Sequence, residues 1–442
     1  MGIACAHSIV HSWSTWPARW QGSEPRRVSS RHTFPKKEKI DRMDLRSGHP
    51  FWRLKNGLLA DYPSLKHDES CEVAVIGGGI TGALVAYHLA QEGVETVLVD
   101  KRDIGAGSTA ASTALLQYEI DTELHDLIDS VGEAHAVRSY RLGLEAIDTV
   151  KRLCGELSDD CGFERKTSLY LASRKSDVSK LRKEYDTRKA FGFRVEYLEA
   201  KAIESRASFT APGAILSYGD AQVDPYRLTH QLLEAAKKQG LRVYDRSEVS
   251  KVEPSDDGVV LHLGSGSRIN GQRVVFATGY ESQQYLKQNV GLLKSTFALI
   301  SEPCDSFEGW PDRSLIWESA RPYFYLRTTS DNRAIVGGGD VPFATAHKSD
   351  QLIAKKTRTL QRRFSDMFPR IGLEVSYTWA GTFGETKDGL AYIGQTPEFP
   401  HAYFALGYGG NGITFSVIAA KIITDLHLCR PNPDADIFRF DR

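Results

Sequence analysis

The chain has 442 residues, of which 41% are hydrophobic and 25% are charged, and these values are close to those of soluble globular proteins. A chain of this length accommodates about two or three domains. Its 56 basic and 56 acidic residues give a net charge of zero, which disfavours nucleic acid as a partner. No apolar run reaches the roughly 18 residues that a membrane-spanning helix needs, so we expect no membrane span.

Cysteine is sparse in this chain. The six cysteines are too few for a disulfide scaffold, and no two of them form a CxxC pair. We therefore expect reduced thiols, no metal site and a cytoplasmic location.

The N-terminal segment differs from the rest of the chain. Residues 1–42 contain eight basic and three acidic residues and show no sustained apolar periodicity. We expect residues 1–48 to form a disordered extension, with Met43 as an alternative start. An organelle transit peptide, which is also rich in Arg and Ser and poor in acids, is the other interpretation. Globular sequence is predicted to begin near residues 49–52.

A nucleotide-binding pattern begins at residue 71. The β-branched run 71–76 predicts a buried parallel strand, and the glycines that follow it, Gly77, Gly79 and Gly82, match G-x-G-x-x-G. A predicted helix and a second predicted strand lead on to Asp100. Strand, glycine turn, helix, strand and acid in this order are typical of dinucleotide-binding folds.

Each part of this pattern has a physical role. Gly77 permits a tight turn, Gly79 lets the backbone approach a pyrophosphate, and Gly82 lets the helix pack closely on the strand. The helix N-terminus offers N–H groups and a positive dipole end to the phosphates. Asp100, 18 residues after Gly82, is placed to accept hydrogen bonds from ribose hydroxyls.

The pattern alone does not decide between NAD and FAD. The loop after the acid, residues 101–117, is rich in small and hydroxyl side chains and is suited to wrap a pyrophosphate. Together with later segments it resembles the FAD-dependent amine and amino-acid oxidoreductases that include D-amino-acid oxidase, glycine oxidase and sarcosine oxidase. The resemblance spans about residues 70–430, and the later segments are 220–228, 241–254, 273–280, 379–394 and 405–416.

The resemblance implies an α/β fold in which a Rossmann-like FAD-binding domain carries a second, largely antiparallel β-sheet substrate domain that is inserted discontinuously. The implied FAD-binding domain comprises residues 70–155, 215–290 and 377–430, and the implied substrate domain comprises residues 156–214 and 291–376. The residues themselves predict an amphipathic helix over 123–153 with a break at Gly132. They also predict strands over 163–171, 191–198, 214–218 and several segments of 292–339.

The implied cofactor is non-covalent FAD, because Gly381 and Ala111 stand where other branches carry the cysteine or histidine that links the flavin. The glycines of 407–412 let backbone pack against a planar ring, and the helix that begins near Ile413 directs its positive end to the ring edge where charge develops on reduction. The implied cofactor-binding residues are Gly77, Gly79, Ile80, Thr81, Gly82, Asp100, Lys101, Gly107, Ser108, Thr109, Val249, Ala277, Thr278, Gly279, Gly381, Gly409, Gly410, Asn411, Gly412 and Ile413.

The implied reaction is oxidation of the C–N bond of an amine or amino acid. Hydride passes to flavin N5, the resulting imine is hydrolysed, and oxygen or another acceptor takes the electrons. The implied catalytic residues are Tyr323, Tyr325, Arg327, Trp379 and Asn411, with Tyr408 near the ring. A guanidinium can hold a carboxylate by two parallel hydrogen bonds, which is the role expected of Arg327. The alternatives are a surface strand position for Arg327 and ordinary core or sheet positions for the two tyrosines.

Two departures from the family bear on the substrate and the electron acceptor. Phe383 stands where the glycine-oxidase branch carries the arginine that holds the substrate carboxylate, which favours an amine or an N-substituted substrate. The lysine that assists the oxygen reaction in sarcosine oxidase is replaced near Ile335, and this leaves both oxidase and dehydrogenase open. Two other functions are a nicotinamide-dependent dehydrogenase, which gives the signature 407–412 no role, and an FAD-binding protein without redox activity.

Overall fold

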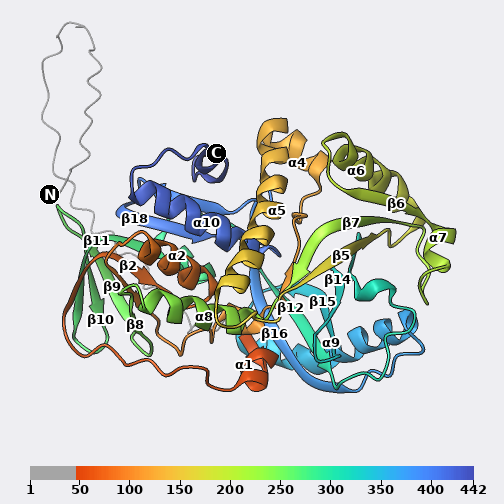
Figure 1. Cartoon of the computed structure of the whole chain (residues 1–442), viewed down its shortest axis with the longest axis horizontal. Coiled ribbons are helices and arrows are strands. Elements are labelled where there is room, and N and C mark those ends of the chain that lie inside the picture. The colour runs from red at the N-terminus through yellow and green to blue at the C-terminus, as the bar shows by residue number, and fades with distance from the viewer. Residues whose placement is uncertain (1–45) are drawn as a thin grey trace, which may run out of the picture. The chain divides into compact units, whose positions relative to one another are not determined.

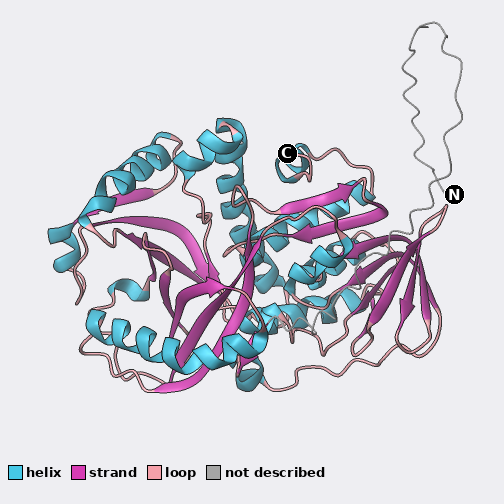
Figure 2. Cartoon of the chain, turned by 180° about the vertical axis from the view of Figure 1, so that it is seen from behind, coloured by secondary structure: helices cyan, strands magenta, loops and turns pink. Residues whose placement is uncertain are grey.

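The computed structural model describes residues 46–442, which belong to one compact unit that contains two β-sheets (Figure 1). Figure 2 shows the two groups of strands in opposite halves of this unit, with helices packed against both. The α/β fold class that the sequence predicts is confirmed, including a nucleotide-binding sheet and a second, largely antiparallel sheet.

The first sheet has eight strands and is built around parallel neighbours in the order β18-β11-β2-β3-β8, with β17 antiparallel at one edge. Strands β9 and β10 continue from β11 as an antiparallel meander. Parallel strands are buried on both faces, which explains the continuous β-branched runs. The strands are β2 Glu69–Ile76, β3 Thr96–Val99, β8 Arg242–Tyr244, β9 Val249–Pro254, β10 Val259–Leu263, β11 Arg268–Phe276, β17 Tyr392–Thr396 and β18 Phe399–Leu406.

Three helices pack together beside this sheet. Helix α2 (Ile80–Gln91) lies between α8 (Pro225–Lys237) and α10 (Gly412–His427), as Figure 1 shows, and its apolar side chains join theirs in one core cluster. Helix α8 starts as the sequence predicts, because Pro225 is its first residue and the Asp224 carboxylate accepts hydrogen bonds from the N–H groups of residues 226 and 227.

The second sheet has ten strands in the order β1-β16-β12-β15-β14-β13-β5-β7-β4, with β6 paired to β7. Every strand pair in it is antiparallel except β13 with β5. The strands are β1 Arg46–Gly48, β4 Leu115–Leu116, β5 Glu164–Leu171, β6 Val195–Glu199, β7 Gly213–Gln222, β12 Leu292–Ser301, β13 Leu315–Glu318, β14 Phe324–Thr328, β15 Ala334–Pro342 and β16 Val375–Glu385.

The two faces of this sheet have different coverings. Helix α9 (Ala346–Met367) packs on one face, over Phe324 and Leu326. The opposite face carries Tyr323, Tyr325 and Arg327, because successive strand residues point to opposite sides. The short helices α1 (Phe51–Asn56) and α3 (Ser108–Ala111) cover one end of that second face.

The remaining helices follow the predicted pattern. The predicted break at Gly132, whose φ is +84°, separates α4 (Leu124–Val131) from α5 (Glu133–Glu156). Helices α6 (Val178–Ala190) and α7 (Ala200–Glu204) flank β6. Short 3-10 turns lie at Lys175–Asp177, Gly279–Tyr285, Pro311–Arg313 and Pro433–Phe438.

Two expected boundaries differ from the structure. Residues 46–48 form β1, in which Ser47 lies opposite Ala380 at the edge of the second sheet, so ordered structure begins before residue 49; the rest of the expected extension lies outside the described residues. The expected domain boundaries at 215 and 377 fall inside β7 and β16, and both strands belong to the ten-stranded sheet. The sequence pattern shows that a strand exists but not which sheet it joins.

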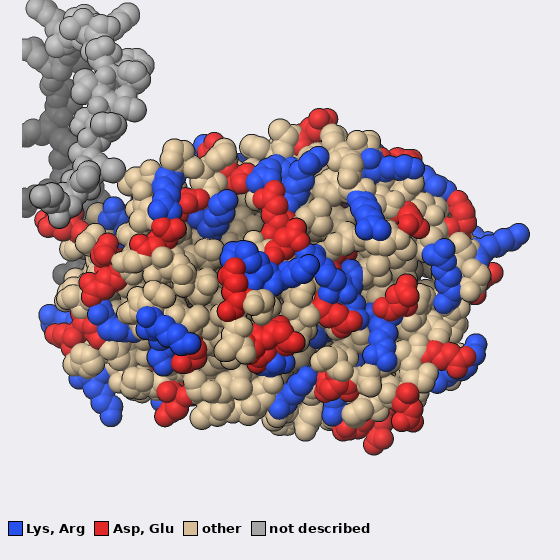
Figure 3. Space-filling view, viewed as in Figure 1, with Lys and Arg blue, Asp and Glu red and all other residues tan. Residues whose placement is uncertain are grey.

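The surface and the helices agree with the composition. Basic and acidic side chains are interspersed over the face shown in Figure 3. Among residues 46–442, no helix combines the length and the apolar composition that crossing a membrane requires.

Candidate functional site

The turn between β2 and α2 requires glycine at the predicted positions. Gly77 has a φ of +112°, and a Cβ atom there would lie 2.4 Å from the carbonyl oxygen of Ala277. A Cβ atom on Gly82 would lie 1.8 Å from the carbonyl oxygen of Gly77. Both contacts are with backbone, which has no rotamer to change. The helix therefore approaches the strand as closely as the dinucleotide pattern predicts.

Helix α2 begins at this turn with its N-terminus toward the loop that follows Asp100. Gly79 is the N-cap and supplies no side chain, while Ile80 N donates to Thr109 Oγ1 over 2.9 Å. Gly107 is the N-cap of α3, and the exposed Ser108 is its first residue. Helix α3 is thus held against the positive end of α2, where a phosphate is favoured.

Asp100 directly follows β3. Its carboxylate accepts hydrogen bonds from Gly78 N at 2.6 Å and from Arg102 N at 2.7 Å. Burial raises the pKa of this carboxyl, and the two N–H groups oppose that effect. The position, beside the glycine turn at the end of the second parallel strand, is the one at which a ribose is recognised.

An ion pair that the sequence does not indicate ties this loop to the next strand end. Lys101 Nζ and Arg102 Nη2 lie 2.7 and 2.9 Å from the carboxylate oxygens of Glu281. Because β11 runs parallel to β2, with Phe276 opposite Ile76, the predicted segment 277–279 lies beside Gly77. Val249 is the first residue of β9 and is partly buried against the core cluster that contains Ile76 and Phe276.

The C-terminal glycine loop is held by the segment that leads into α4. Gly410 N donates to Asp121 Oδ2 over 2.7 Å, and Gly409 N donates to Gly384 O over 3.0 Å. The side-chain amide of Asn411 donates to two carbonyl oxygens, at 3.2 Å on Gln117 and at 2.8 Å on Glu119. The Asn411 side chain therefore fixes the loop, and its expected catalytic role stays a prediction.

Two helix N-termini converge at this point. The hydroxyl oxygens of Thr81, in the first turn of α2, and Ser416, in the first turns of α10, lie 2.7 Å apart. The buried Tyr408 packs close to both, and Gly412 and the buried Ile413 start α10. The positive ends of α2 and α10 thus point into the same region, which favours a ligand with negative charge at two places.

The second sheet meets α3 at the predicted residues Trp379 and Gly381. Trp379 is buried, and its indole N–H donates to the carbonyl oxygen of Ala111 over 2.8 Å. A Cβ atom on Gly381 would lie 3.3 Å from the Cβ of Ala111. Trp379 therefore anchors α3 to the sheet, and neither 381 nor 111 offers a thiol or an imidazole to a flavin.

The predicted tyrosines lie on the same sheet face beside Asp121. Tyr323 Oη donates to the carbonyl oxygen of Asp121 over 3.3 Å, and the Arg321 guanidinium lies 3.3 Å from the centre of the Tyr323 ring. Tyr325 Oη lies 3.1 Å from Thr296 Oγ1. The first contact places Tyr323 beside the segment that holds the glycine loop, and the charge of Asp121 also acts on Tyr325.

Three carboxyl groups gather around these tyrosines, and Asp121, Asp340 and Glu385 influence one another electrostatically. Burial raises the pKa of Asp340 to about 6 and also raises that of Asp121. Lys294 Nζ lies 2.6 Å from Glu385 Oε2, so this cation is paired. No sequence pattern indicates these three acids, because an isolated acid belongs to no motif and only the fold brings them together.

Arg327 differs from both expectations. It is 2% exposed, which excludes a surface position. Its Nη1 donates to the carbonyl oxygens of Ala114 at 2.6 Å and Val223 at 3.1 Å, and its guanidinium lies 5.2 Å from the centre of the Trp52 ring. Burial lowers its pKa to about 10. Arg327 therefore braces backbone segments, and its head group is enclosed by the protein.

Replacement of Arg327 by methionine is expected to lower the free energy of unfolding by about 2–4 kcal/mol, since two buried carbonyl oxygens lose their donor. The KM of the folded variant should stay within about twofold of the original, which corresponds to well under 1 kcal/mol. Urea unfolding and steady-state kinetics test this, with the exposed Arg358→Met on α9 as the control. A large rise in KM at unchanged stability would restore the carboxylate-holding role.

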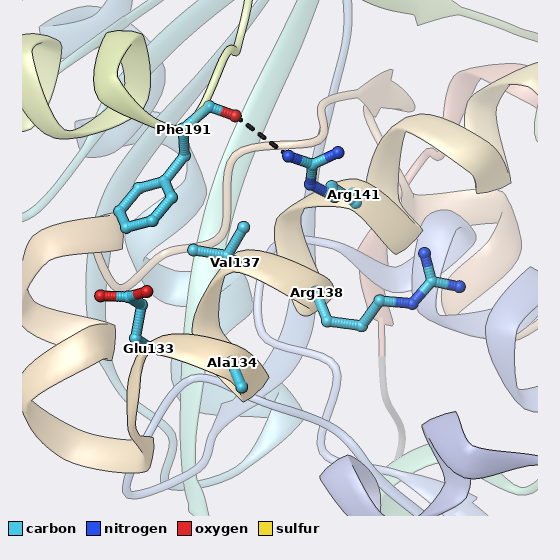
Figure 4. Close-up of a pocket in the computed structure, with 6 residues that line it drawn as sticks. All are labelled: Glu133, Ala134, Val137, Arg138, Arg141 and Phe191. Atoms are coloured by element: carbon cyan, nitrogen blue, oxygen red, sulfur yellow. Dashed lines mark hydrogen bonds between the residues drawn. The ribbon is translucent and has the colours of Figure 1, made fainter.

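A surface depression elsewhere contributes nothing to this site. It is lined by α5 and by Phe191 (Figure 4), and its arginines are already bonded: Arg138 to Glu145 and Asp434, and Arg141 to the carbonyl oxygen of Phe191.

The described residues fit FAD. A turn too tight for any Cβ, an acid directly after the second strand and two helix N-termini that meet supply sites for the pyrophosphate, the adenosine ribose and the flavin ring edge of the cofactor.

Comparison with known proteins agrees with this fit. Residues 72–426 match the family model described as FAD dependent oxidoreductase. The chain is 29% identical to glycine oxidase of Bacillus subtilis over 84% of its own length and 97% of that protein. It is 25% identical to γ-glutamylputrescine oxidoreductase of Escherichia coli over 83% of its length and 86% of that protein. The crystal structure of glycine oxidase from Geobacillus kaustophilus superimposes with a TM-score of 0.68 at 22% identity, over 83% of this chain and 96% of that one.

These matches decide between the cofactors that the glycine pattern left open, in favour of the flavin. The chain belongs to the FAD-dependent oxidoreductases of the D-amino-acid oxidase type and is an enzyme of the amine and amino-acid oxidoreductase class.

Proposed function

We propose that this enzyme oxidises the C–N bond of a positively charged amine, either primary or N-substituted, in preference to a simple α-amino acid. The observation that carries the proposal is the charge of the sheet face beside the glycine loop. Asp121, Asp340 and Glu385 lie there among tyrosines. The family resemblance aligns Phe383, on β16, with the carboxylate-binding arginine of the glycine-oxidase branch. Such a surface attracts an ammonium group and repels a carboxylate.

The two nearby cations, Lys294 and Arg321, offset only part of the charge of the three acids. Lys294 is paired with Glu385, and Arg321 lies on the face of the Tyr323 ring while donating to the carbonyl oxygen of Asp121. Aromatic faces around an acidic pocket add further attraction for a cation. The Asp340 carboxyl, with a pKa of about 6, is ionised at neutral pH and thus available to hold the substrate ammonium or to accept its proton.

The residues that hold FAD are those of the two helix N-termini, Asp100 and the glycine loop. When bound, FAD supplies the hydride acceptor for the α-hydrogen of the substrate, and water then hydrolyses the imine product. The chain itself orients the amine and excludes bulk water through Tyr323, Tyr325 and the loop at Gly410.

Anaerobic mixing of the yellow holoenzyme with single compounds tests this function. Aliphatic monoamines, diamines and N-alkylated amines are expected to bleach the flavin absorbance, and glycine is not. Re-oxidation by oxygen or only by a dye then distinguishes an oxidase from a dehydrogenase. Bleaching by glycine with no response to any amine would contradict the proposal, and no bleaching by any compound would favour a non-redox role.

Asp340→Asn is expected to lower kcat/KM for the amine at least tenfold, since it removes the ionised group; a tenfold loss equals about 1.4 kcal/mol. In the unchanged enzyme kcat/KM should fall as the pH drops below about 6, where Asp340 becomes protonated, and the variant should lose that dependence. The exposed Asp350→Asn on α9 serves as the control. An unchanged pH profile in Asp340→Asn would exclude this role.

A second candidate substrate is an amine that also carries a distant carboxylate. Arg321 is exposed beside Tyr323 and has donors in addition to the one used by Asp121. In that case Arg321→Gln raises KM for carboxylate-bearing amines and leaves simple amines unaffected.

We also propose a cytoplasmic location for the protein, because Cys71, Cys154, Cys161 and Cys304 are buried free thiols, as in a reducing compartment.

A further inference from the structure

The segment 117–125 carries the glycine loop on one side and is fixed by buried charges on the other. On the loop side, the carbonyl oxygens of Gln117 and Glu119 accept the Asn411 amide, and the Asp121 carboxylate accepts Gly410 N. A displacement of this segment therefore displaces the loop at the N-terminus of α10. The position of the loop depends on whatever fixes the segment.

The far side of the segment is fixed at two places. Asp220, on β7, accepts Tyr118 N at 3.1 Å through Oδ1. Glu184, on α6, accepts the N–H groups of Leu124 at 2.9 Å and His125 at 3.1 Å. Both carboxyl groups are completely buried. Each therefore accepts the hydrogen bonds that the backbone N–H groups would otherwise donate to water.

A single guanidinium bonds two carboxyl groups in this region and acts on a third, Asp220, through its charge. Arg188 donates to Glu184 over 2.6 Å and to Glu119 over 3.2 Å, and all three side chains are buried, as is Asp220. The rings of Tyr118 and Tyr140 flank Arg188 at 6.0 and 5.7 Å. Full ionisation would place three negative charges around one positive charge in a dry interior, which is energetically costly.

Two buried carboxyl oxygens that have no hydrogen-bond partner show where a proton can neutralise part of this negative charge. Glu119 Oε2 and Asp220 Oδ2 are both inaccessible to solvent and have no hydrogen-bond donor within the described structure. The groups that face Asp220 are Glu119 and Tyr118 from the segment, Arg188 from α6 and Lys166 from β5, and Lys166 Nζ is bonded to Glu164. Burial, together with the charge of Glu119, raises the pKa of Asp220 well above its usual value. One proton placed between the two oxygens satisfies both.

We propose that Glu119 and Asp220 share a single proton and that this protonated pair is a positioning element for the flavin-facing loop 409–412. The pair does not touch substrate or cofactor. It acts through Tyr118 N and the carbonyl oxygen of Glu119, and it sets how tightly FAD is retained.

Replacement of Asp220 separates this role from ordinary packing. In Asp220→Asn the amide N–H takes the place of the shared proton, and Oδ1 can still accept Tyr118 N. In Asp220→Ala both interactions are lost. We expect the FAD dissociation constant, measured from the fluorescence increase on dilution of the holoenzyme, to stay within about twofold in Asp220→Asn and to rise at least tenfold in Asp220→Ala. The exposed Asp129→Asn in α4 is the control.

Infrared spectroscopy tests the proton itself and does not depend on the alanine variant folding. At pH 7 the unchanged protein is expected to show the carbonyl band of a protonated carboxyl group that is missing from Asp220→Asn and present in Asp129→Asn. Absence of that difference band would overturn the proposal. Loss of FAD from a folded Asp220→Asn would overturn it as well, because the carboxylate charge and not the shared proton would then be required.

Discussion

Replacement of Gly82 by alanine is expected to remove FAD from the purified protein. The added Cβ would lie 1.8 Å from the carbonyl oxygen of Gly77, and neither atom can move without separating α2 from β2. Overpacking typically costs 1–3 kcal/mol even where side chains can adjust. We therefore expect the FAD dissociation constant to rise at least tenfold, which corresponds to a loss of about 1.4 kcal/mol of binding free energy. The purified variant should then show little absorbance in the visible region.

A second glycine supplies the matched control for this prediction. Gly155 lies within α5, has no atoms within 4 Å of a Cβ built on it and has no positive φ. Gly155→Ala should keep the yellow colour and gain up to about 1 kcal/mol of stability, since alanine favours helix. If Gly82→Ala retained FAD as well as Gly155→Ala does, the close approach of α2 to the turn would not be what binds the pyrophosphate.

The second large effect is expected at Arg188. Its replacement by methionine leaves Glu119 and Glu184 buried without their cation. Removal of one partner of a buried ion pair typically costs about 3–5 kcal/mol, because the remaining charge is not compensated. Urea unfolding should show a loss of this size, and FAD retention should weaken because the segment 117–125 loses its anchor.

The exposed Arg152 is the control for Arg188. It pairs with Glu156 one helical turn away on α5, and exposed pairs of this kind contribute about 0.3–0.5 kcal/mol. Arg152→Met should therefore be nearly neutral. An Arg188→Met variant that is as stable as Arg152→Met would show that the buried charges are neutralised in another way.

The cofactor half of the site could be predicted from sequence because its parts are local. Gly77, Gly82 and Asp100 stand within one strand–helix–strand unit, and their spacing reflects distances along the chain. The same holds for the loop at Gly409 and Gly410, which directly precedes its helix. Such patterns can be recognised in a sequence without knowledge of the rest of the fold.

The substrate half depends on packing between distant segments. Alternation in β14 places Tyr323, Tyr325 and Arg327 on one face, but it does not show what covers that face at each point. Trp52 of α1 covers the end at Arg327, with its indole N–H donating to Ser112 O over 2.7 Å. The face near Asp340 is instead lined by acids from other strands. Arg327 was therefore assigned to the wrong surroundings.

The charged pair at Glu119 and Asp220 could not be predicted for a related reason. Its members are a loop residue and a strand residue about one hundred positions apart, and each is an acid that sequence rules place at the surface. The antiparallel pairing of β4 with β7 and the packing of α6 bring them together.

We propose that this chain holds FAD non-covalently, at two helix N-termini that meet beside the glycine turn. Acid precipitation of the purified holoenzyme, followed by absorbance measurement of both fractions, tests it directly. We expect a colourless pellet and about one FAD per chain in the supernatant, because residues 381 and 111 are glycine and alanine. A yellow pellet would contradict non-covalent binding, and a folded protein that neither contains nor takes up FAD would contradict the whole account.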